Sequence, residues 1–289
     1  MTVRITVATL FMLAVIRADG AQATAPMRAR TLQPGEVVVL TSIGDARSES
    51  VRVHAFKHWF PAYQEGEAWS AMIGIDLDTR PGTYQIEVES RVDGQIVHQS
   101  YPLQVQAKNF RTRRLTVNEA FVTPPKSEEA RIEREAALLA ETWTSTSAVR
   151  LWTTTFVRPV PQAANSAFGT RSIFNGKPRN SHGGADFLSP AGTPIHAPNA
   201  GRIAVARDLY FSGNTVIIDH GLGVFSTMAH LSRIDVREGD AVVPGQILGL
   251  VGATGRVTGP HLHWAVRVGD ARVDPLSLLW AVGQERGKG

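Results

Sequence analysis

The amino-acid sequence predicts an all-β protein in which two β-rich domains are joined by a linker with one helix. Two observations lead to this fold class. Residues 31–105 consist of short apolar or alternating runs separated by turn signals, which is typical of β-strands. After residue 151, similar runs alternate with glycine-bearing turns, and nineteen of the 26 glycines follow Phe168. A chain of 289 residues is long enough for two such domains, each with its own core.

The composition describes a globular protein and narrows the choice of partners. Hydrophobic residues make up 43% of the chain and charged residues 19%, which is typical of folded domains. The formal net charge is +4, and no basic run is interleaved with aromatic residues, so the sequence does not indicate a nucleic-acid partner. Cysteine is absent. Disulfides are therefore excluded, and any metal site must use histidine, aspartate or glutamate ligands.

The first 23 residues have the pattern of a secretory signal peptide. A positively charged start, MTVR, precedes an apolar run from Ile5 to Ile16, and the small residues of ADGAQATA follow. The apolar run is shorter than the roughly 20 residues that a membrane-spanning helix needs. We therefore expect cleavage at an A-x-A site near Ala23. The mature protein is expected to be exported, without a membrane span.

Residues 27–107 are predicted to form a β-sandwich of immunoglobulin-like type. Five runs have the character of strands: EVVVLT, VRVHAF, WSAMIGIDL, GTYQIEVES and QIVHQSYPLQV. Asp93-Gly94, between the last two runs, is a strong hairpin signal. Several short strands separated by turn signals favour a small sandwich.

Residues 108–150 are predicted to be a linker that contains the one long helix. The basic stretch KNFRTRRL and Pro124-Pro125 mark the boundary, and SEEARIEREAALLAETW follows. Ser127 is expected as the N-cap, with Glu128 and Glu129 in the first turn, where negative charge stabilises a helix. The helix either connects the two domains or packs on the surface of one of them.

Residues 151–284 are predicted to form a second all-β domain of many short strands. Its runs include RIAVA, NTVIID, GVFSTMAH, QILGLV and HLHWAVRV. The segment VREGDAVVPGQILGLV is similar to a hairpin of biotinyl and lipoyl carrier domains. GATGR stands where a carrier would have its modified lysine, so the similarity concerns local architecture and not function.

Six of the nine histidines lie in this second domain, where two pairs of residues are candidate metal ligands. His261 and His263 are two apart in a predicted strand, so their side chains share one face. His182 and Asp186 are four apart, but Gly183-Gly184 between them favours a loop that runs into a strand. A catalytic zinc site without cysteine needs three such ligands and an open position. Each pair alone also fits ordinary, partly exposed polar residues.

Four motifs of the second domain resemble the lysostaphin/LytM-type zinc metallo-endopeptidases, which hydrolyse peptide cross-links of bacterial peptidoglycan. These motifs are FGTRSIFNGKPRNSHGGADF (168–187), GNTVIIDHG (213–221), MAHLS (228–232) and GATGRVTGPHLHW (252–264). The resemblance covers about residues 150–280. It implies an antiparallel β peptidase domain with one zinc ion and peptidoglycan as the substrate. Residues 27–107 also resemble the amino-terminal domain of some exported Gram-negative members. This domain pairing implies that the protein acts in the periplasm or cell envelope.

The resemblance implies a role for each residue of these motifs. The HxxxD motif of the family matches His182 and Asp186, and the second histidine of its HxH motif matches His263. These three residues are therefore expected to be the zinc ligands. The first histidine of HxH matches His261, and the histidine of the AHLS motif matches His230. Both are expected to be catalytic without binding the metal.

Such a ligand set suits hydrolysis. Two neutral imidazoles and one carboxylate leave zinc positively charged with an open position, so a zinc-bound water of lowered pKa can attack the scissile carbonyl. The chain has no HExxH motif, so His230 and His261 share proton transfer and oxyanion stabilisation, in an order that the sequence leaves open. Arg171 and Tyr210 are candidates for substrate binding, although a surface salt bridge explains Arg171 equally well.

Other functions fit the sequence less well. Some members of the family have lost metal ligands and activate other wall hydrolases, but all five expected residues are present here. A binding module for carbohydrate or cell wall fits the amino-terminal domain better than the carboxy-terminal one. The amino-terminal domain can also dock a regulatory partner or cover the groove and inhibit, and these alternatives stay open.

Overall fold

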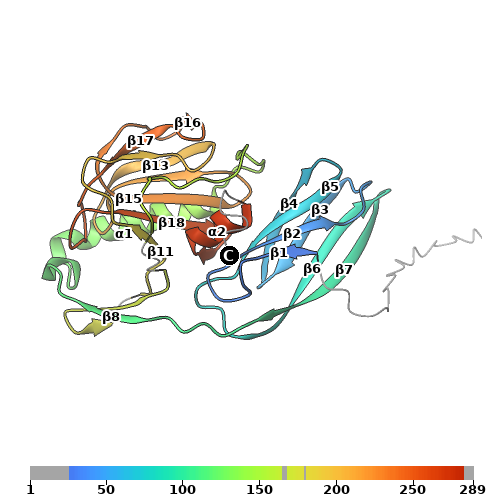
Figure 1. Ribbon diagram of the computed structural model, residues 1–289, viewed down its shortest axis with the longest axis horizontal. Coiled ribbons are helices and arrows are strands. Elements are labelled where there is room, and N and C mark those ends of the chain that lie inside the picture. Colours follow the sequence, from blue (N-terminus) through green and yellow to red (C-terminus); the bar gives the residue numbers. More distant parts are fainter. Residues whose placement is uncertain (1–25, 165–167, 179, 283–289) are drawn as a thin grey trace, which may run out of the picture.

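The two β-rich domains lie side by side along the long axis of the molecule (Figure 1). The computed structural model describes residues 26–164, 168–178 and 180–282. The signal peptide predicted for residues 1–23 lies outside these residues. Within the described part of the chain, no helix is long and apolar enough to cross a membrane.

Seven antiparallel strands build the amino-terminal domain, in the spatial order β1-β2-β5-β4-β3-β6-β7. They are β1 (Met27–Arg28), β2 (Val37–Ile43), β3 (Ser50–Ala55), β4 (His58–Glu65), β5 (Ala68–Gly74), β6 (Gly82–Val92) and β7 (Gln95–Val105). Strand β4 pairs with β3 through residues 58–61 and with β5 through residues 62–65. The two halves of the predicted sandwich therefore share a strand and form one continuous sheet.

Strand β2 is buried on both of its faces. Its residues 37–40 are all 0% exposed, although successive side chains of a strand point to opposite faces. One face belongs to the core of the amino-terminal domain, and helix α2 (Pro275–Val282) of the other domain packs against β2. The apolar run EVVVLT thus marks the interface between the domains.

Polar contacts close the same interface. The carboxylate of Glu36, which is 1% exposed, accepts hydrogen bonds from Arg30 Nη2 and from Ser277 Oγ, each at 2.7 Å. Arg30 also pairs with Asp274 at 2.7 Å. One cluster of buried apolar side chains includes residues of both domains. Because this core is continuous, the two domains form one packed unit.

The carboxy-terminal domain is a curled antiparallel sheet of nine strands. Its path runs β11-β18-β15-β14-β13-β16, while β12, β17 and β19 pair beside it. The strands are β11 (Gly184–Phe187), β12 (Pro194–His196), β13 (Gly201–Leu209), β14 (Gly213–Asp219), β15 (Val224–Ile234), β16 (Ala241–Val242), β17 (Ile247–Val251), β18 (Leu262–Val268) and β19 (Ala271–Val273). The all-β fold class predicted from the sequence is confirmed.

A small separate sheet brings part of the linker into this domain. Its order is β10-β9-β8, formed by β10 (Lys177–Pro178), β9 (Arg171–Phe174) and β8 (Thr112–Leu115). Strand β8 belongs to the linker and pairs in parallel with β9. The short 3₁₀ helix η1 (Glu119–Phe121) follows β8. The linker is therefore partly a structural element of the carboxy-terminal domain.

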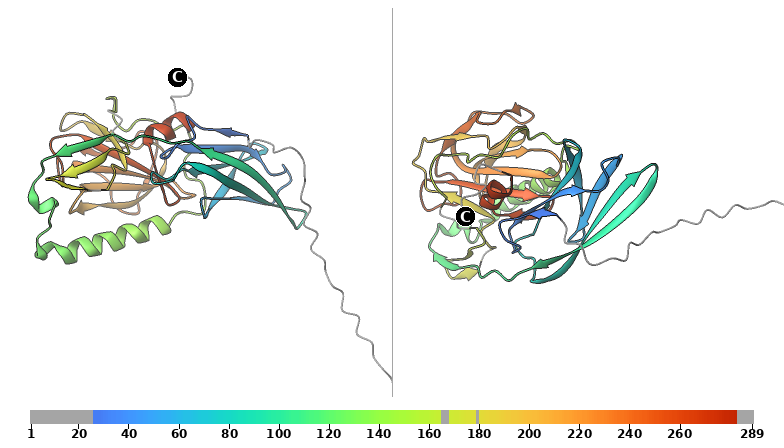
Figure 2. Two further views of the ribbon diagram at one scale, coloured as in Figure 1. Left: turned by 90° about the horizontal axis from the view of Figure 1, so that it is seen from below. Right: turned by 45° about the vertical axis from the view of Figure 1, so that its right-hand side comes forward.

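Helix α1 (Lys126–Thr144) lies along the outside of the carboxy-terminal domain (Figure 2). Its Leu139 and Trp143 pack on the buried Val205, Ile217 and Phe225 of the sheet. The helix thus follows the second of the two alternatives, packing on one domain.

The expected N-cap of α1 was wrong. The N-cap is Pro125, which has extended backbone angles and makes no side-chain cap hydrogen bond, so Ser127 lies inside the first turn. The locked φ of proline and its missing N–H suit the start of a helix, which here precedes the serine. Glu128 and Glu129 lie in the first turn, as predicted.

A buried histidine links stability to pH. His220, just after β14, is 0% exposed; its Nδ1 lies 2.7 Å from the carbonyl oxygen of Ala200 and its Nε2 3.0 Å from Ser226 Oγ. Burial lowers its pKa from 6.5 to about 4. The ring is therefore neutral in the folded protein near pH 7.

We predict that this histidine makes the protein less stable in mild acid. Its pKa in the unfolded chain is about 6.5, so the unfolded state takes up the proton first, and stability is lost as the pH falls from there towards 4. Between about pH 7 and about pH 4.5, the free energy of unfolding should fall by about 2 to 3 kcal/mol more in the parent than in His220→Gln. Urea denaturation at both pH values measures this, and equal losses in both proteins would contradict it.

Candidate metal centre

The pairing of β11 with β18 places two candidate ligands opposite each other. In this antiparallel register Asp186 faces His263 and Phe187 faces Leu262. On β18 the side chains of Leu262 and Trp264 are buried, whereas His263 between them is only partly buried. The strand alternation predicted for the HxH segment is therefore present, and the histidine projects from the face away from the core.

Three ligand atoms from three positions in the chain form a tight triangle. His182 Nε2 lies 3.0 Å from Asp186 Oδ1 and 2.9 Å from His263 Nδ1. His263 Nδ1 lies 2.9 Å from the same Asp186 oxygen. Within the described ranges, these three residues form the one group of His, Asp or Glu side chains close enough together to hold a metal ion.

The charge states of Asp186 and His263 suit a metal. Burial alone would raise the pKa of Asp186, but hydrogen bonds from His182 and His263 hold that pKa well below its usual range. Burial lowers the pKa of His263. An ionised carboxylate and neutral imidazoles are the forms that bind metals.

Zinc fits this donor set. It binds histidine nitrogen and carboxylate oxygen at about 2.0 to 2.2 Å and prefers four ligands in a tetrahedron. A triangle with edges of 2.9 to 3.0 Å is small enough for one ion to reach all three corners. Three protein ligands leave one position open, which is the arrangement of catalytic zinc sites.

Gly184 allows the ligands to come this close. A Cβ atom at this position would lie 2.6 Å from the carbonyl oxygen of Trp264 and 2.7 Å from His263 Nε2. No side chain fits there without moving the backbone of β18 or the ligand ring. At the neighbouring Gly183, by contrast, the nearest atom is the Arg272 Cδ at 4.0 Å. The close backbone approach predicted from the glycine pair therefore depends on its second member.

His230 enters the site from a β-bulge in β15. Asn214 of β14 faces Leu231 of β15, and Val216 faces Met228, so one residue of β14 opposes two of β15. His230 has a φ of 68°, in the left-handed region that L residues rarely occupy. A bulge re-aims a side chain in this way, and residues held at such angles cluster at functional sites.

A hydrogen bond fixes the tautomer of His230. Its Nδ1 lies 2.9 Å from the carbonyl oxygen of Thr254, to which it must donate a proton. The ring is buried, and this burial lowers its pKa to about 3. His230 is therefore neutral at ordinary pH, with Nε2 as its accepting nitrogen.

His261 has the same tautomer and lies beside the ligands. Its Nδ1 lies 2.8 Å from the carbonyl oxygen of Gly259, and its Nε2 lies 3.8 Å from Asp186 Oδ1. The ring centroids of His261 and His230 are 5.0 Å apart. The structure thus brings together all five residues that the sequence singled out, with three forming the triangle and two next to it.

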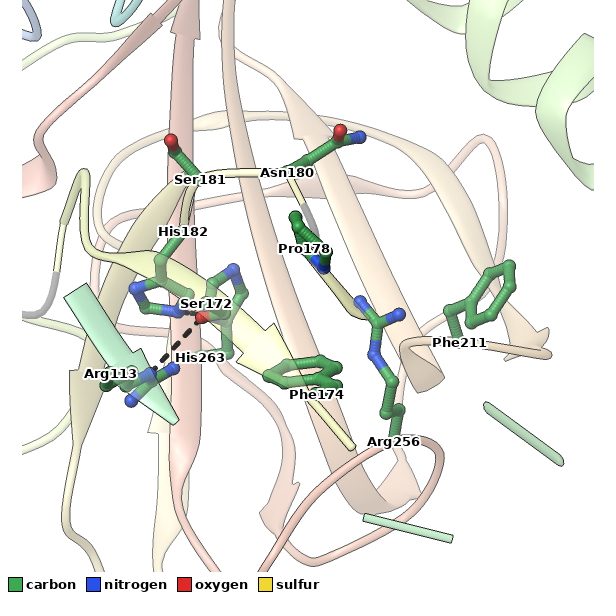
Figure 3. A pocket seen from close by; sticks show the side chains of 11 residues that line it. Arg113, Ser172, Phe174, Pro178, Asn180, Ser181, His182, Phe211, Arg256 and His263 are labelled. Atoms are coloured by element: carbon green, nitrogen blue, oxygen red, sulfur yellow. Dashed lines mark hydrogen bonds between the residues drawn. The ribbon is translucent and has the colours of Figure 1, made fainter. Parts of the chain in front are cut away.

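Two adjoining cavities open on this cluster. One, of about 680 Å³, is lined by Arg113, Ser172, Phe174, Pro178, Asn180, Ser181, His182, Gly183, Phe211, Arg256 and His263 (Figure 3). The other, of about 220 Å³, also borders Asp186, His230 and His261. We call the two together the groove. It places the histidines within reach of a bound chain.

Sequence reasoning missed four residues of the groove wall. Arg113, Phe174, Phe211 and Arg256 line both cavities. Phe174 and Arg256 lie inside the quoted motifs, but no spacing marks them as part of a wall. Arg113 belongs to the linker, and its place depends on the long-range pairing of β8 with β9. Local sequence carries no signal for that pairing.

The two substrate-binding candidates lie outside the groove wall. Arg171 is exposed on β9, where Ser172 and Phe174 on the alternate face line the groove. Tyr210 donates a hydrogen bond from its hydroxyl to the carbonyl oxygen of Ala120 at 2.8 Å, and its ring packs on Phe121. Tyr210 therefore anchors the linker to the domain.

Comparisons with known proteins point to one family. The profile described as Peptidase family M23 matches residues 180–275. A solved Pseudomonas aeruginosa structure assigned to peptidase M23 has a TM-score of 0.70 and 35% identity, covering 88% of this chain and 97% of that one. This likeness extends over both domains.

Relatives that carry the name of an activity match over a shorter region. Peptidoglycan DD-endopeptidase ShyA of Vibrio cholerae is 45% identical over 87 residues, which are 30% of this chain and 20% of that protein. DD-carboxypeptidase/endopeptidase Mpg of Neisseria meningitidis is 42% identical over 97 residues, 34% of this chain and 22% of that protein. The matches thus span about a fifth of the length of these relatives.

We predict that Gly184→Ala weakens metal binding while Gly183→Ala does not. The new methyl group at residue 184 collides with the His263 ring and the β18 backbone, which displaces a ligand. We expect the zinc affinity of Gly184→Ala to fall by roughly 10-fold or more, as when the supports of a ligand are lost. A competition titration against a zinc-binding dye measures this. Equal affinities of the two variants would show that the close approach does not shape the site.

Proposed function

The chain belongs to peptidase family M23, the zinc metallopeptidase family that its motifs resemble, and we propose that it hydrolyses peptide cross-links of bacterial peptidoglycan. One observation carries the proposal: the ligand triangle is complete, and two further histidines with accepting nitrogens line the same groove. The names of the relatives ShyA and Mpg support peptidoglycan as the substrate.

The residues of the chain divide the work of hydrolysis. Zinc bound by His182, Asp186 and His263 would polarise the scissile carbonyl and make water acidic enough to react near neutral pH. His230 and His261 each donate from Nδ1 to a backbone carbonyl, so each offers Nε2 to accept a proton. These backbone contacts hold both rings in place before a substrate binds.

We assign the general base to His261. The accepting Nε2 of His261 lies next to the ligand triangle, 3.8 Å from Asp186 Oδ1. Burial disfavours positive charge on His230. His261 then accepts a proton from the attacking water and delivers it to the leaving amine. His230 orients the same water by accepting a hydrogen bond from it.

We also propose that the protein acts in the periplasm or cell envelope after export. The signal-like pattern of residues 1–23 and a substrate found in the cell wall support this location.

We also keep the domain bounds inferred from the sequence, with residues 151–284 as the peptidase domain. The continuous core and the buried Glu36 support a bracing role for the amino-terminal domain. Docking of a regulatory partner stays a prediction.

We predict that cross-linked peptidoglycan fragments become monomers only with zinc-loaded protein. His261→Ala should lower the cleavage rate by about 10² to 10⁴-fold, the usual contribution of a general base. His196→Ala, which alters a histidine of β12 outside the groove lining, should leave it unchanged. Mass spectrometry of the fragments, with and without a chelator, measures both effects.

The outcome that contradicts the proposal is specific. Protein that holds one zinc ion per chain and still leaves cross-links intact would contradict the proposal and favour the activator alternative. If the protein cuts directly cross-linked stem peptides but leaves stems joined through glycine bridges intact, the difference shows its substrate specificity and does not contradict the proposal.

A further inference from the structure

Two guanidinium groups line both cavities beside the ligand triangle. Arg113 comes from the linker strand β8, and Arg256 comes from the loop between β17 and β18. Figure 3 shows both side chains at the cavity, with the ring of Phe174 between them in this view. Among the described residues that line the groove, Asp186 is the only acidic one, and it is a candidate metal ligand.

The pairing of β8 with β9 sets the orientation of Arg113. The parallel register places Arg113 beside Ser172 and Leu115 beside Phe174. Arg113 and Leu115 are partly buried and line the groove, whereas Arg114 between them is exposed. The Nε of Arg113 donates to Ser172 Oγ at 3.4 Å, which uses one of its five N–H donors.

Aromatic rings hold Arg256 in place. Its guanidinium carbon lies 5.2 Å from the centroid of Phe174 and 5.0 Å from that of Phe211. Its backbone N–H also donates to the carbonyl oxygen of Phe211 at 2.8 Å. The ring contacts and this backbone hydrogen bond therefore hold Arg256 at the groove wall.

We propose that Arg113 and Arg256 form a carboxylate-binding subsite that holds a free carboxylate of the peptide substrate beside the scissile bond. The planar N–H fork of arginine matches a carboxylate, and such charge-assisted pairs are among the strongest hydrogen bonds in proteins. This inference rests on the proposed function and narrows it. The preferred substrate is a peptide with a free carboxylate near the bond that is cut, and amidated or neutral bridges are poorer substrates.

The subsite makes the linker part of the catalytic groove. Arg113 and Leu115 lie outside the region that the family profile matches, residues 180–275. A peptidase domain without residues 108–117 would keep its metal ligands and lose one of the two guanidinium groups. Substrate choice would then differ between proteins that have the same three metal ligands and different linkers.

The test compares two synthetic peptides that differ in one group. Both carry the same D-amino-acid bond, and one has a free carboxylate next to it where the other has a carboxamide. Calorimetry with the zinc-loaded, full-length His261→Ala protein measures binding without turnover. We expect the carboxylate peptide to bind roughly 10-fold or more tightly than the carboxamide, since hydrogen bonds to charged groups are strong.

Variants locate the source of this preference. In the same background, Arg113→Ala and Arg256→Ala should each reduce the carboxylate preference by at least about 5-fold. Arg114→Ala, a change on the same strand but on its exposed face, should leave it unchanged. The zinc content of each variant shows whether the site is intact, and Arg113→Lys, which keeps the charge without the planar fork, should retain part of the preference.

Two results would overturn the subsite: equal binding of both peptides to the starting protein, or a preference that survives in the Arg113→Ala, Arg256→Ala double variant. The first needs no variant to fold. Cleavage of the two peptides by the unmodified, zinc-loaded protein is measured separately. A carboxylate preference in binding without cleavage would support the subsite and refute the endopeptidase function.

Discussion

The hydrogen-bonded pairing of β11 with β18 is the constraint on which the ligand triangle depends. It sets Asp186 directly opposite His263, and the absence of a side chain at Gly184 lets the two strands and the His263 ring come together. His182, on the loop before β11, then completes the triangle. On the other side of β18, Ala229 of β15 faces His263, and its small side chain lines the groove. The next residue, His230, sits in the bulge.

The two histidines beside the ligand triangle are oriented by the backbone. His230 and His261 donate to the carbonyl oxygens of Thr254 and Gly259, which fixes both tautomers without any other side chain. The bulge holds His230 at a positive φ, and such strain costs of order 1 to 3 kcal/mol. The surrounding sheet supplies that energy, because β15 is hydrogen-bonded to β14, β17 and β18.

Local patterns in the sequence predicted the parts of the site that depend on local geometry. Strand alternation placed His261 and His263 on one face, and the glycine pair after His182 indicated a loop running into a strand. The role of each histidine came from family resemblance. The bulge at His230 and the position of Arg113 in the groove wall were not predicted, because both depend on pairing between strands distant in the sequence. The same limit explains Tyr210, which contacts the linker and not the groove. Ser127 failed as an N-cap because the proline two residues earlier already starts the helix.

The arrangement of the five residues predicts that one histidine of the HxH pair binds zinc and that the other does not. Crystals of the zinc-loaded protein, with diffraction data collected on both sides of the zinc absorption edge, test this most directly. We predict one anomalous peak within bonding distance of His182 Nε2, Asp186 Oδ1 and His263 Nδ1, with the His261 ring outside the coordination sphere. A peak bonded to His261, or one that lies away from Asp186, would contradict it.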